Sequence, residues 1–557
     1  MTEKTNIELN IEGMTCDSCA THVESALKSV PGVENASVPG WESGRASVET
    51  STDVDITSLE AVVKEAGYSA AIKPKTGQKR SAVPIIAKGQ DGNHIHLMVI
   101  GGGSAGFAAA IKGSELGYKV ALVESGTIGG TCVNVGCVPS KALIRAMEQY
   151  HLAGESRFKG VNTLPGQLDW SKIIADKDSL VDDLRKAKYS DVLAGYPNVT
   201  YIEGHAKLTG GNGVEIDGTP YSPDKIIITT GANPWAPPIP GLAEAGYLTS
   251  TSAMELTKLP QSMIVMGANA VGLEQAQIFA RAGVSITVVE LLERIAPFED
   301  EEISAALVGY LEEEGLQIVT SFQSTQVEKN ETGYTLIGTQ NGKDIKLNAE
   351  RLLIATGRRP NTAGMGLEES GVQLGKRGEI IVDETMQTTN PDVYAAGDVT
   401  GRDMFVYIAA YAGGLSAENA LTGETKAFDA DYIPRVTFTD PQIASAGLTE
   451  AQAIEKGYSV KVSTLPMEYV PRALAARDTR GLVKLVADAN TDKLLGAHIL
   501  APESGEMIQT AVMAIRFGIT VQELRDTIFP YLTNVEGLKL AILAFEKDVS
   551  MLSCCAG

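Results

Sequence analysis

The chain has 557 residues, of which 44% are hydrophobic and 21% are charged, values typical of a globular protein rather than a disordered or collagen-like one. Its formal net charge is −22, and an acidic surface repels phosphate backbones, which argues against nucleic-acid binding. The N-terminus lacks a secretory signal, and the longest uncharged apolar stretch, residues 97–111, is too short and glycine-rich to span a bilayer. We therefore expect a cytoplasmic protein with no stable membrane insertion.

Residues 1–72 carry the pattern of a small separate domain. Alternating apolar residues predict strands and helical periodicity predicts helices, in the order strand 7–11, helix 20–30, strand 35–38, strand 44–50, helix 56–66 and strand 70–73. This βαββαβ order predicts a ferredoxin-like sandwich. Residues 73–94 are polar, basic and rich in chain breakers, so we expect a flexible linker there.

Two regions further along carry the glycine fingerprint of a dinucleotide-binding βαβ unit. Each has a buried strand, a glycine-rich turn that opens a helix, and a second strand that ends in an acidic residue. The first consists of strand 96–100, Gly101, Gly103, Gly106, strand 119–123 and Glu124. The second consists of strand 263–266, Gly267, Asn269, Gly272, strand 285–289 and Glu290. In both copies the acid follows the last glycine by 18 residues, which predicts two Rossmann-type domains.

Each residue of a fingerprint has a physical task. The first glycine makes the turn, the second lets the backbone approach a pyrophosphate, and the third packs the helix on the strand. Asn269 replaces the middle glycine of the second copy; asparagine tolerates unusual backbone angles but adds bulk, which predicts a less snug site. Glu124 and Glu290 are expected to accept hydrogen bonds from an adenosine ribose.

The six cysteines form three close pairs, Cys16/Cys19, Cys132/Cys137 and Cys554/Cys555. In a reducing compartment such pairs indicate redox or soft-metal sites rather than a disulfide framework. The chain has only six histidines and none after His498, which argues against imidazole-rich zinc or iron sites. A zinc site at Cys132 and Cys137 would need two further ligands, and no other cysteine or histidine lies within ten residues of them.

The second pair stands in the segment GGTCVNVGCVPSK, residues 129–141. Two cysteines five residues apart at a helix start can close a small disulfide or hold two thiolates side by side. The helix dipole and Lys141 are expected to lower the pKa of these thiols. This segment resembles the redox centre of the flavin disulfide reductases. The resemblance extends over residues 95–557 and includes Thr230-Gly231, residues 355–361 (ATGRRPN) and residues 395–398 (AAGD).

The resemblance implies a domain layout and a cofactor. The expected FAD-binding domain has two parts, residues 95–251 and 359–428. An NAD(P)H-binding domain is expected between them, over residues 252–358, and a dimerisation domain with the Cys-Cys tail over residues 429–557. FAD is expected in the first Rossmann site, with Asp398 at its ribityl chain and Lys141 near its ring. Further implied contacts to FAD are Gly126, Thr131, Ala206, Gly231 and Val406. Cys137 is implied to be the flavin-proximal thiolate, and Cys132 the outer thiol.

One departure from the family's pattern changes the expected substrate. Disulfide reductases carry a His-Pro dipeptide and a downstream glutamate near the C-terminus, because the thiol leaving group needs a proton. The matching stretch here has Phe529 in place of the histidine, although Glu536 remains. Phenylalanine moves no proton, so the expected substrate is one whose reduction needs no proton relay.

A soft metal ion is such a substrate. Residues 13–20, GMTCDSCA, resemble the metal loop of the heavy-metal-associated domain, in which Cys16 and Cys19 would bind Hg(II) or Cu(I). Cys554 and Cys555 are adjacent on a tail and are expected to be reduced thiols. All three pairs together resemble the mercuric reductases, which reduce thiol-bound Hg(II) to Hg(0). In that family the C-terminal pair of one subunit serves the redox pair of the other in a homodimer, and Tyr189 and Tyr531 match tyrosines that flank Hg(II).

Two other functions stay open. One is a disulfide oxidoreductase of the dihydrolipoamide dehydrogenase type, which Phe529 disfavours. The other is a non-catalytic metal-binding protein, which would need neither nucleotide signature. The nicotinamide is also open: the family favours NADPH, Glu290 is typical of NADH sites, and Arg294 could compensate by binding the 2′-phosphate.

Overall fold

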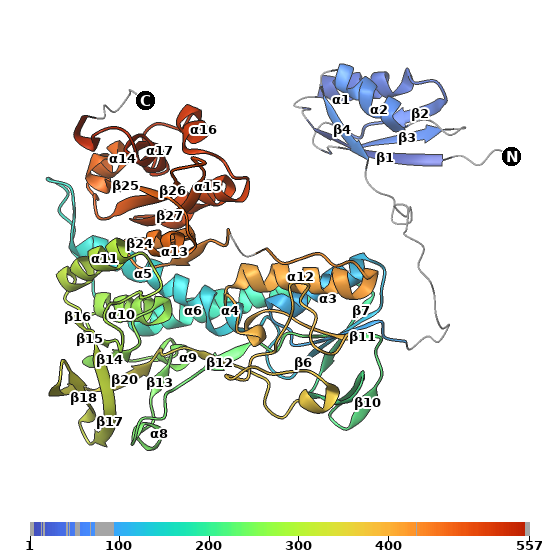
Figure 1. Cartoon of the computed structure of the whole chain (residues 1–557). Coiled ribbons are helices and arrows are strands. Elements are labelled where there is room, and N and C mark those ends of the chain that lie inside the picture. Colours follow the sequence, from blue (N-terminus) through green and yellow to red (C-terminus); the bar gives the residue numbers. More distant parts are fainter. Residues whose placement is uncertain are drawn as a thin grey trace. The chain divides into compact units, whose positions relative to one another are not determined.

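The computed structural model describes residues 5–12, 14, 17–40, 43, 45–50, 56–66, 68–72, 94–429 and 432–551. The chain forms two compact units, residues 1–91 and 92–557 (Figure 1). Three predicted cysteines (Cys16, Cys554 and Cys555) and linker residues 73–93 lie outside the described residues.

The first unit has the predicted ferredoxin-like order, which the structure confirms. Its elements are β1 (Thr5–Glu12), α1 (Asp17–Lys28), β2 (Val33–Ser37), β3 (Arg45–Thr50), α2 (Ile56–Glu65) and β4 (Ser69–Ile72). The sheet has the order β2-β3-β1-β4, with β1 antiparallel to both β3 and β4. Alternating residues of β1 and the apolar faces of both helices form the core, and Cys19 on α1 packs partly buried against it.

The second unit begins with a parallel sheet of order β22-β11-β5-β6-β7. Its strands are β5 (Leu97–Ile100), β6 (Val120–Glu124), β7 (Val199–Glu203), β11 (Lys225–Ile228) and β22 (Val393–Ala395). Strand β5 is fully buried, as its run of apolar residues predicts. Helices α3 (Ser104–Glu115) and α12 (Val406–Thr422) pack side by side on this domain (Figure 1). A small sheet, β8 (Ala206–Gly210), β9 (Gly213–Ile216) and β10 (Thr219–Tyr221), is attached to it.

The second nucleotide domain is inserted between β11 and β22. Its parallel sheet has the order β13-β20-β14-β15-β16, made of β13 (Leu248–Thr249), β14 (Ser262–Met266), β15 (Ser285–Val289), β16 (Gln317–Val319) and β20 (Arg351–Ile354). Between β16 and β20 the chain forms a separate antiparallel sheet, made of β17 (Phe322–Asn330), β18 (Gly333–Gln340) and β19 (Lys343–Ala349). Entry and exit segments pair as β12 (Ala232–Pro234) and β21 (Arg358–Pro360).

The C-terminal domain is an antiparallel sheet of order β23-β24-β27-β26-β25 with helices packed on it. The strands are β23 (Arg435–Thr437), β24 (Gln442–Gly447), β25 (Val460–Pro466), β26 (Leu482–Asp488) and β27 (Leu494–Ala501). The helices are α13 (Glu450–Glu455), α14 (Pro471–Ala476), α15 (Ser504–Arg516), α16 (Val521–Asp526) and α17 (Glu536–Leu543). The predicted fold class, two Rossmann-type domains with an α+β domain and a ferredoxin-like domain, is therefore confirmed.

The second unit also contains α4 (Gly130–Val135), α5 (Cys137–Gly154), α6 (Trp170–Arg185), α7 (Asp191–Leu193), α8 (Leu242–Ala245), α9 (Ser250–Ala253), α10 (Ala270–Arg281) and α11 (Glu301–Glu313). Helix α5 packs on both α6 and α10, so it links the two nucleotide domains. Within the described parts of the chain, none of the helices combines the length and the apolar character needed to cross a membrane.

Candidate active site

The two glycine fingerprints form the same tight turn. Gly101 has φ +113°, and a Cβ there would lie 2.4 Å from the carbonyl oxygen of Thr229. A Cβ on Gly106 would lie only 1.8 Å from the carbonyl oxygen of Gly101. In the second copy, Gly272 is held equally close to the carbonyl oxygen of Gly267, at 1.8 Å. The first and third glycines are therefore required by the contact between the turn and its helix.

The middle position behaves differently. Gly103 and Asn269 are the N-caps of α3 and α10, with extended backbones at φ −78° and −104°. Extended backbone accepts any residue, so Asn269 needs no unusual backbone angle here, and the less snug site expected from its bulk stays a prediction. Gly103 has no side chain to cap its helix, and the side chain of Asn269 makes no capping hydrogen bond. The first amides of both helices are thus free of a side-chain cap, as phosphate binding at a helix N-terminus requires.

Glu124 and Glu290 both hold the turn that precedes their helix. The carboxylate of Glu124 accepts hydrogen bonds from the amides of Gly102 (2.6 Å) and Gly126 (2.7 Å). That of Glu290 accepts from the amides of Ala268 (2.7 Å) and Leu292 (3.0 Å). A carboxylate has about four lone-pair sites, so each acid keeps acceptor capacity for a ribose hydroxyl.

The cysteine motif packs directly against the first fingerprint. The amide of Gly129 donates to the carbonyl oxygen of Gly102 at 2.9 Å. A Cβ on Gly130 would lie 2.6 Å from the Cα of Gly103, so only glycine permits this approach of two backbones. Cys132 lies in α4, and Cys137 is the first residue of α5. The thiol pair is therefore placed next to the turn that would hold a pyrophosphate.

The electrostatics of the pair distinguish its two members. The thiol of Cys132 donates a hydrogen bond to Cys137, and with the nearby Lys141 it lowers the pKa of Cys137 to about 7, against the effect of burial. The same hydrogen bond and burial raise the pKa of Cys132. Cys137 also stands at the N-terminus of α5, where the helix dipole favours negative charge. Neither cysteine forms a disulfide with a described residue.

Lys141 is held by a partner that the sequence reasoning missed. Its Nζ lies 2.7 Å from Glu274 Oε2 and 4.5 Å from the ring centroid of Phe438. Glu274 lies on α10 with its side chain only 7% exposed, and its other oxygen accepts from the amide of Phe438 at 2.9 Å. This pair connects α5 with the second nucleotide domain and the C-terminal domain. One sequence signal could have indicated this partner: Glu274 is an acidic residue only two positions after Gly272, in a helix that packs closely on its sheet.

Tyr189 lies close to the thiol pair, in a π-helical turn (Lys186–Ser190) that follows α6. Its ring meets that of Phe107 edge-on with centroids 4.8 Å apart, and its hydroxyl lies 3.5 Å from Ser104 Oγ. Burial raises the pKa of Tyr189, and negative charge on Cys132 and Cys137 raises it further. Single π-helical turns within helices often mark functional positions.

An unpaired buried donor lies between the first fingerprint and Asp398. Asp398 begins a 3₁₀ turn (Asp398–Thr400) after β22, and burial raises its pKa. Arg358 Nε is 3.8 Å from Asp398 Oδ2, and Arg358 Nη2 is 3.4 Å from Thr131 Oγ1. Among the described residues Arg358 Nε has no hydrogen-bond partner although it is buried. This donor and the uncapped N-terminus of α3 fit a polar, phosphate-bearing ligand such as FAD.

The other predicted cofactor residues lie in the same domain. Gly231 follows β11 with φ +70°, and next to it Thr230 Oγ1 donates to the carbonyl oxygen of Asn361 at 2.7 Å. The Thr230-Gly231 and ATGRRPN segments are thus joined to each other. Ala206 begins β8 and Val406 begins α12.

Phe529 and Tyr531 lie in a different domain from the cysteine pair. Both are in the loop between α16 and α17 of the C-terminal domain, where Phe529 packs on the core and Tyr531 is 54% exposed. Glu536 is buried at the start of α17, its carboxylate accepts from the amide of Leu532 at 3.1 Å, and burial raises its pKa. The structure therefore brings Tyr189, but not Tyr531, next to the cysteines of the same chain.

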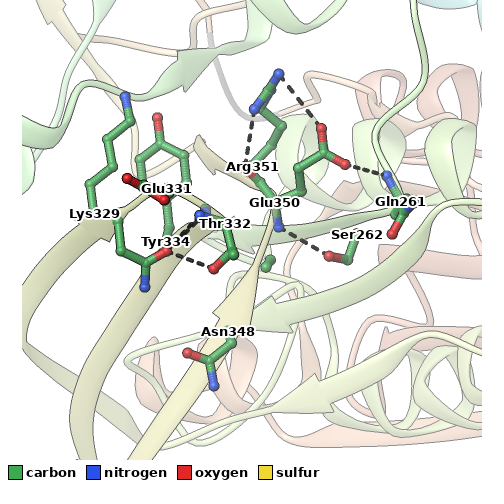
Figure 2. Close-up of a pocket in the computed structure, with 12 residues that line it drawn as sticks. Gln261, Ser262, Lys329, Glu331, Thr332, Tyr334, Asn348, Glu350 and Arg351 are labelled. Carbon is green, nitrogen blue, oxygen red and sulfur yellow. Dashed lines mark hydrogen bonds and ion pairs between the residues drawn. The ribbon is translucent and has the colours of Figure 1, made fainter.

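A polar hollow of about 690 Å³ lies on the second nucleotide domain, away from these residues (Figure 2). Two of its charged side chains bond to backbone groups: Glu350 accepts from the amide of Gln261 at 2.7 Å, and Lys329 donates to the carbonyl oxygen of Ala245 at 2.7 Å. No residue of the predicted site lines it. The functional argument therefore rests on the thiol pair and its neighbours.

Comparisons with known proteins agree with this arrangement. Residues 95–413 match the pyridine nucleotide-disulphide oxidoreductase family, residues 433–542 match the dimerisation domain of that family, and residues 8–69 match the heavy-metal-associated domain. A mercuric reductase of Bacillus cereus is 44% identical over 564 residues, which cover 100% of this chain and 88% of that protein. A mercuric reductase of Streptomyces lividans is 47% identical over 471 residues, 83% of this chain and 98% of that protein.

Solved structures give the same architecture. The HOCl-induced flavoprotein disulfide reductase RclA from Escherichia coli matches with a TM-score of 0.72 at 31% identity, over 80% of this chain and 99% of that one. LpdA from Mycobacterium tuberculosis matches with a TM-score of 0.72 at 26% identity, over 81% of this chain and 99% of that one. Both solved chains are covered almost completely, which supports a common fold.

Proposed function

The chain belongs to the pyridine nucleotide-disulphide oxidoreductase family, and we propose that it works as a mercury(II) reductase in mercury detoxification. The observation that carries this proposal is the level and extent of similarity: relatives named mercuric reductase share 44% and 47% identity, against 31% for the flavoprotein disulfide reductase RclA and 26% for LpdA. The balanced reaction is NAD(P)H + Hg(II) → NAD(P)⁺ + H⁺ + Hg(0). It needs NAD(P)H and reduced thiols, which supports a cytoplasmic setting.

The residues that would hold FAD are those of the first fingerprint, Glu124, Arg358 and Asp398. When bound, FAD carries two electrons from the nicotinamide to the cysteine side of the site. The amides at the start of α3 would bind the pyrophosphate, and Lys141, held by Glu274, would supply a cation toward the flavin. Glu274 offsets part of this charge, so Lys141 lowers the pKa of Cys137 by less than an isolated cation would.

The thiol pair supplies the ligands for the substrate. Cys137, with a pKa near 7, is the member that carries negative charge, and Cys132 holds its proton until a metal ion displaces it. Hg(II) prefers thiolate ligands, so the two sulfurs bind it between them after ligand exchange. Two electrons then convert Hg(II) to Hg(0), which has little affinity for thiolate and leaves. Tyr189 lines the same place and limits access of water to it.

Delivery of the ion involves the other cysteines. We propose that Cys554 and Cys555 of one subunit strip external thiols from Hg(II) and pass it to Cys132 and Cys137 of the partner subunit. The match of residues 433–542 to a dimerisation domain supports the homodimer that this transfer requires. Tyr531, in the same domain as the tail, is proposed to flank the ion on its way.

The test is a comparison of substrates on one preparation. The purified protein is expected to oxidise NADPH with Hg(II) presented as a small thiol complex, and to show only background rates with lipoamide or glutathione disulfide. Equal turnover of a disulfide would establish a disulfide oxidoreductase instead. Hg(II) binding without NADPH oxidation would establish a metal-binding protein without catalysis.

A matched pair of glycine variants tests the FAD site. Gly103→Ala adds a Cβ whose nearest contact is 3.7 Å away, at the Cα of Gly130, so the apoprotein should unfold at its usual temperature. The added methyl should nevertheless weaken FAD binding, because it stands where the backbone approaches the pyrophosphate. Gly106→Ala should lose thermal stability as well, since its Cβ overlaps a carbonyl oxygen. FAD retained by Gly103→Ala at the original affinity would contradict the proposed close approach.

The nicotinamide is proposed to be NADPH, with NADH also accepted because of Glu290. The two Nη groups of Arg294 donate to the carbonyl oxygens of Glu299 and Pro297, both at 2.8 Å, so much of its hydrogen-bonding capacity is used within its own loop. Glu290→Gln keeps an acceptor oxygen but removes a charge that repels the 2′-phosphate. Two charges 4 Å apart in bulk water interact by about 1 kcal/mol, so kcat/KM for NADPH over NADH should rise at least about fivefold. Glu124→Gln is the control, and an unchanged ratio in Glu290→Gln would refute the role of that charge.

Deletion of residues 1–72 tests the part played by the first unit. All residues of the proposed catalytic site that the structure describes lie in the second unit, so kcat with small Hg(II)–thiol complexes should stay unchanged. The measurement is steady-state NADPH oxidation by both forms at saturating substrate. A large loss of kcat would show that this unit takes part in the catalytic step.

A further inference from the structure

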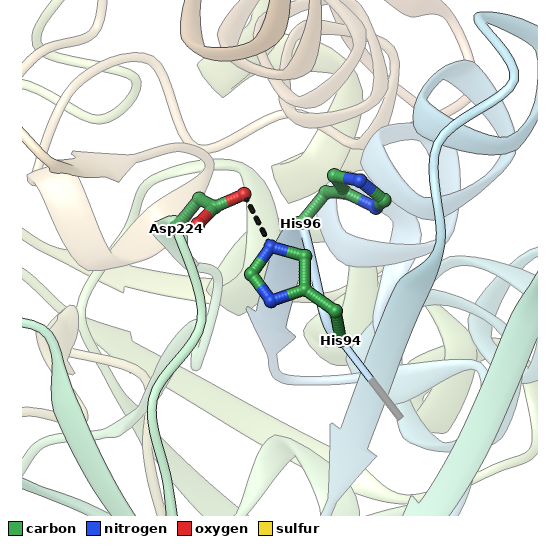
Figure 3. Close-up of side chains that lie close together, drawn as sticks. All are labelled: His94, His96 and Asp224. Atoms are coloured by element: carbon green, nitrogen blue, oxygen red, sulfur yellow. Dashed lines mark hydrogen bonds and ion pairs between the residues drawn. The ribbon is translucent and has the colours of Figure 1, made fainter. Parts of the chain in front are cut away.

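We infer that His94, His96 and Asp224 form a binding site for a divalent metal ion of the zinc class, separate from the cysteine sites. One ring nitrogen of each histidine and one carboxylate oxygen of Asp224 lie within 4.8 Å of one another. Figure 3 shows the three side chains gathered in one place, with His94 Nε2 2.9 Å from Asp224 Oδ2. The rings of His94 and His96 meet edge-on with centroids 4.9 Å apart.

The backbone that carries these residues is fixed by the first parallel sheet. His94 and His96 lead into β5, and Asp224 leads into β11, which pairs with β5 so that Lys225 faces Leu97. The amide of Asp224 donates to the carbonyl oxygen of Ile95 at 3.2 Å. The site therefore lies at the amino ends of the strands, whereas the fingerprint that follows β5 lies at the carboxyl end. The two sites therefore lie at opposite ends of the strands of one sheet.

The ligand set selects a class of ion. Two imidazoles and a carboxylate suit borderline divalent ions such as Zn²⁺, whereas Hg(II) and Cu(I) prefer thiolates. Zinc bonds of about 2.0–2.2 Å place tetrahedral ligand atoms about 3.3–3.6 Å apart, so ligand atoms up to 4.8 Å apart close by about 1 Å while His94 and Asp224 separate slightly. The side chains of His94 and Asp224 are 31% and 53% exposed and can make that adjustment. Three protein ligands leave a fourth position for water.

Among the described residues, the lysine next to Asp224 in sequence does not neutralise its carboxylate. Lys225 turns its ammonium to Asp392, at 2.5 Å, and so leaves the charge of Asp224 uncompensated by it. The amide of Lys119 donates to His96 Nδ1 at 3.2 Å, a bond that an ion on this nitrogen would replace at a surface open to water. A simple ion pair between His94 and Asp224 is the competing explanation, and it gives His96 no part.

The experiment uses the full-length, FAD-loaded protein with its thiols blocked by N-ethylmaleimide, so that cysteines cannot take up the probe. Zn²⁺ alone is titrated calorimetrically, and thermal unfolding is followed with and without it. We expect one equivalent per chain and a rise in the unfolding temperature, because an ion that binds only the folded state stabilises it. Removing a residue that only supports a metal ligand lowers metal affinity about 10–100-fold. Removing a ligand itself should cost no less, so His94→Gln and Asp224→Asn should each lower zinc affinity at least about tenfold.

His151→Gln is the matched control, since it removes an imidazole that stands 3.8 Å from a carboxylate oxygen of Glu155 elsewhere on the surface. It should bind zinc as the unchanged protein does. His96→Gln separates the two explanations, because the ion pair alone predicts no loss on this change. Uptake below one equivalent, or unchanged affinity in His94→Gln or His96→Gln, would overturn the site. Unfolding temperatures measured without zinc show whether each variant is folded.

Discussion

Cys137→Ala is expected to abolish NADPH-dependent Hg(II) reduction and the long-wavelength absorbance of a thiolate beside the flavin. The change removes a thiol whose pKa is lowered to about 7, and with it a ligand of the proposed Hg(II) site. Turnover is measured as NADPH oxidation and mercury loss, and absorbance is recorded on the reduced protein. Retention of both signals would remove Cys137 from the site.

Cys132→Ala provides the control, because it should abolish turnover but keep the absorbance. In the unchanged protein the thiolate forms as pH rises through about 7, so the band should appear over that range and vanish below it. Cys132 stabilises the thiolate by a hydrogen bond, so the midpoint should move to higher pH in Cys132→Ala. A midpoint that stays in place would contradict the hydrogen bond between the two sulfurs.

Phe529→His is expected to exchange one specificity for another. An imidazole at this position adds an acid–base group of the kind that disulfide exchange needs, so reduction of a small disulfide should rise above background. It also adds a competing nitrogen ligand for Hg(II) and, when protonated, an ion-pair partner for the outer thiolate. An effect of about one pKa unit is roughly 1.4 kcal/mol, so Hg(II) turnover should fall about tenfold. Both activities are measured between pH 6 and 8 on one preparation.

The neighbours of Phe529 define the control. Lys539 Nζ lies 5.9 Å from the centre of the ring, and Glu536 accepts from the amide of Leu532. Phe529→Leu keeps an apolar side chain there and should retain Hg(II) turnover without disulfide exchange. If Phe529→His keeps the original Hg(II) turnover and shows no disulfide exchange, specificity must come from the cysteine tail and the tyrosines.

The fold could be predicted where its signals are local. The glycine fingerprints and the alternation of residues 7–11 depend on near neighbours in sequence, and the structure has strands and helices in those places. The partners of short strands could not be predicted. The three residues of β22 pair with β11, which ends 165 residues before β22 begins. Nothing in the sequence of β22 indicates that partner.

The same limit applies to the site. The cysteine motif is contiguous, so its position at a helix start could be predicted from the sequence. Glu274 is 133 residues from Lys141, and their contact depends on how two domains pack. The small number of histidines argued against imidazole sites, but a count does not show that His94 and His96 meet Asp224 across two strands.

The late arrival of β22 also sets an order of events on the ribosome. Synthesis at about 5–20 residues per second leaves roughly 8–33 s between the end of β11 and the start of β22. During that interval β11 is an edge strand with unpaired backbone groups, and every strand of the inserted domain, from Leu248 to Ile354, is synthesised before β22 begins. The first nucleotide domain, although its synthesis begins first, can therefore complete its sheet only after the inserted domain has completed its own. A ribosome that stalls between residues 355 and 392 would leave a finished inner domain attached to an open, aggregation-prone sheet.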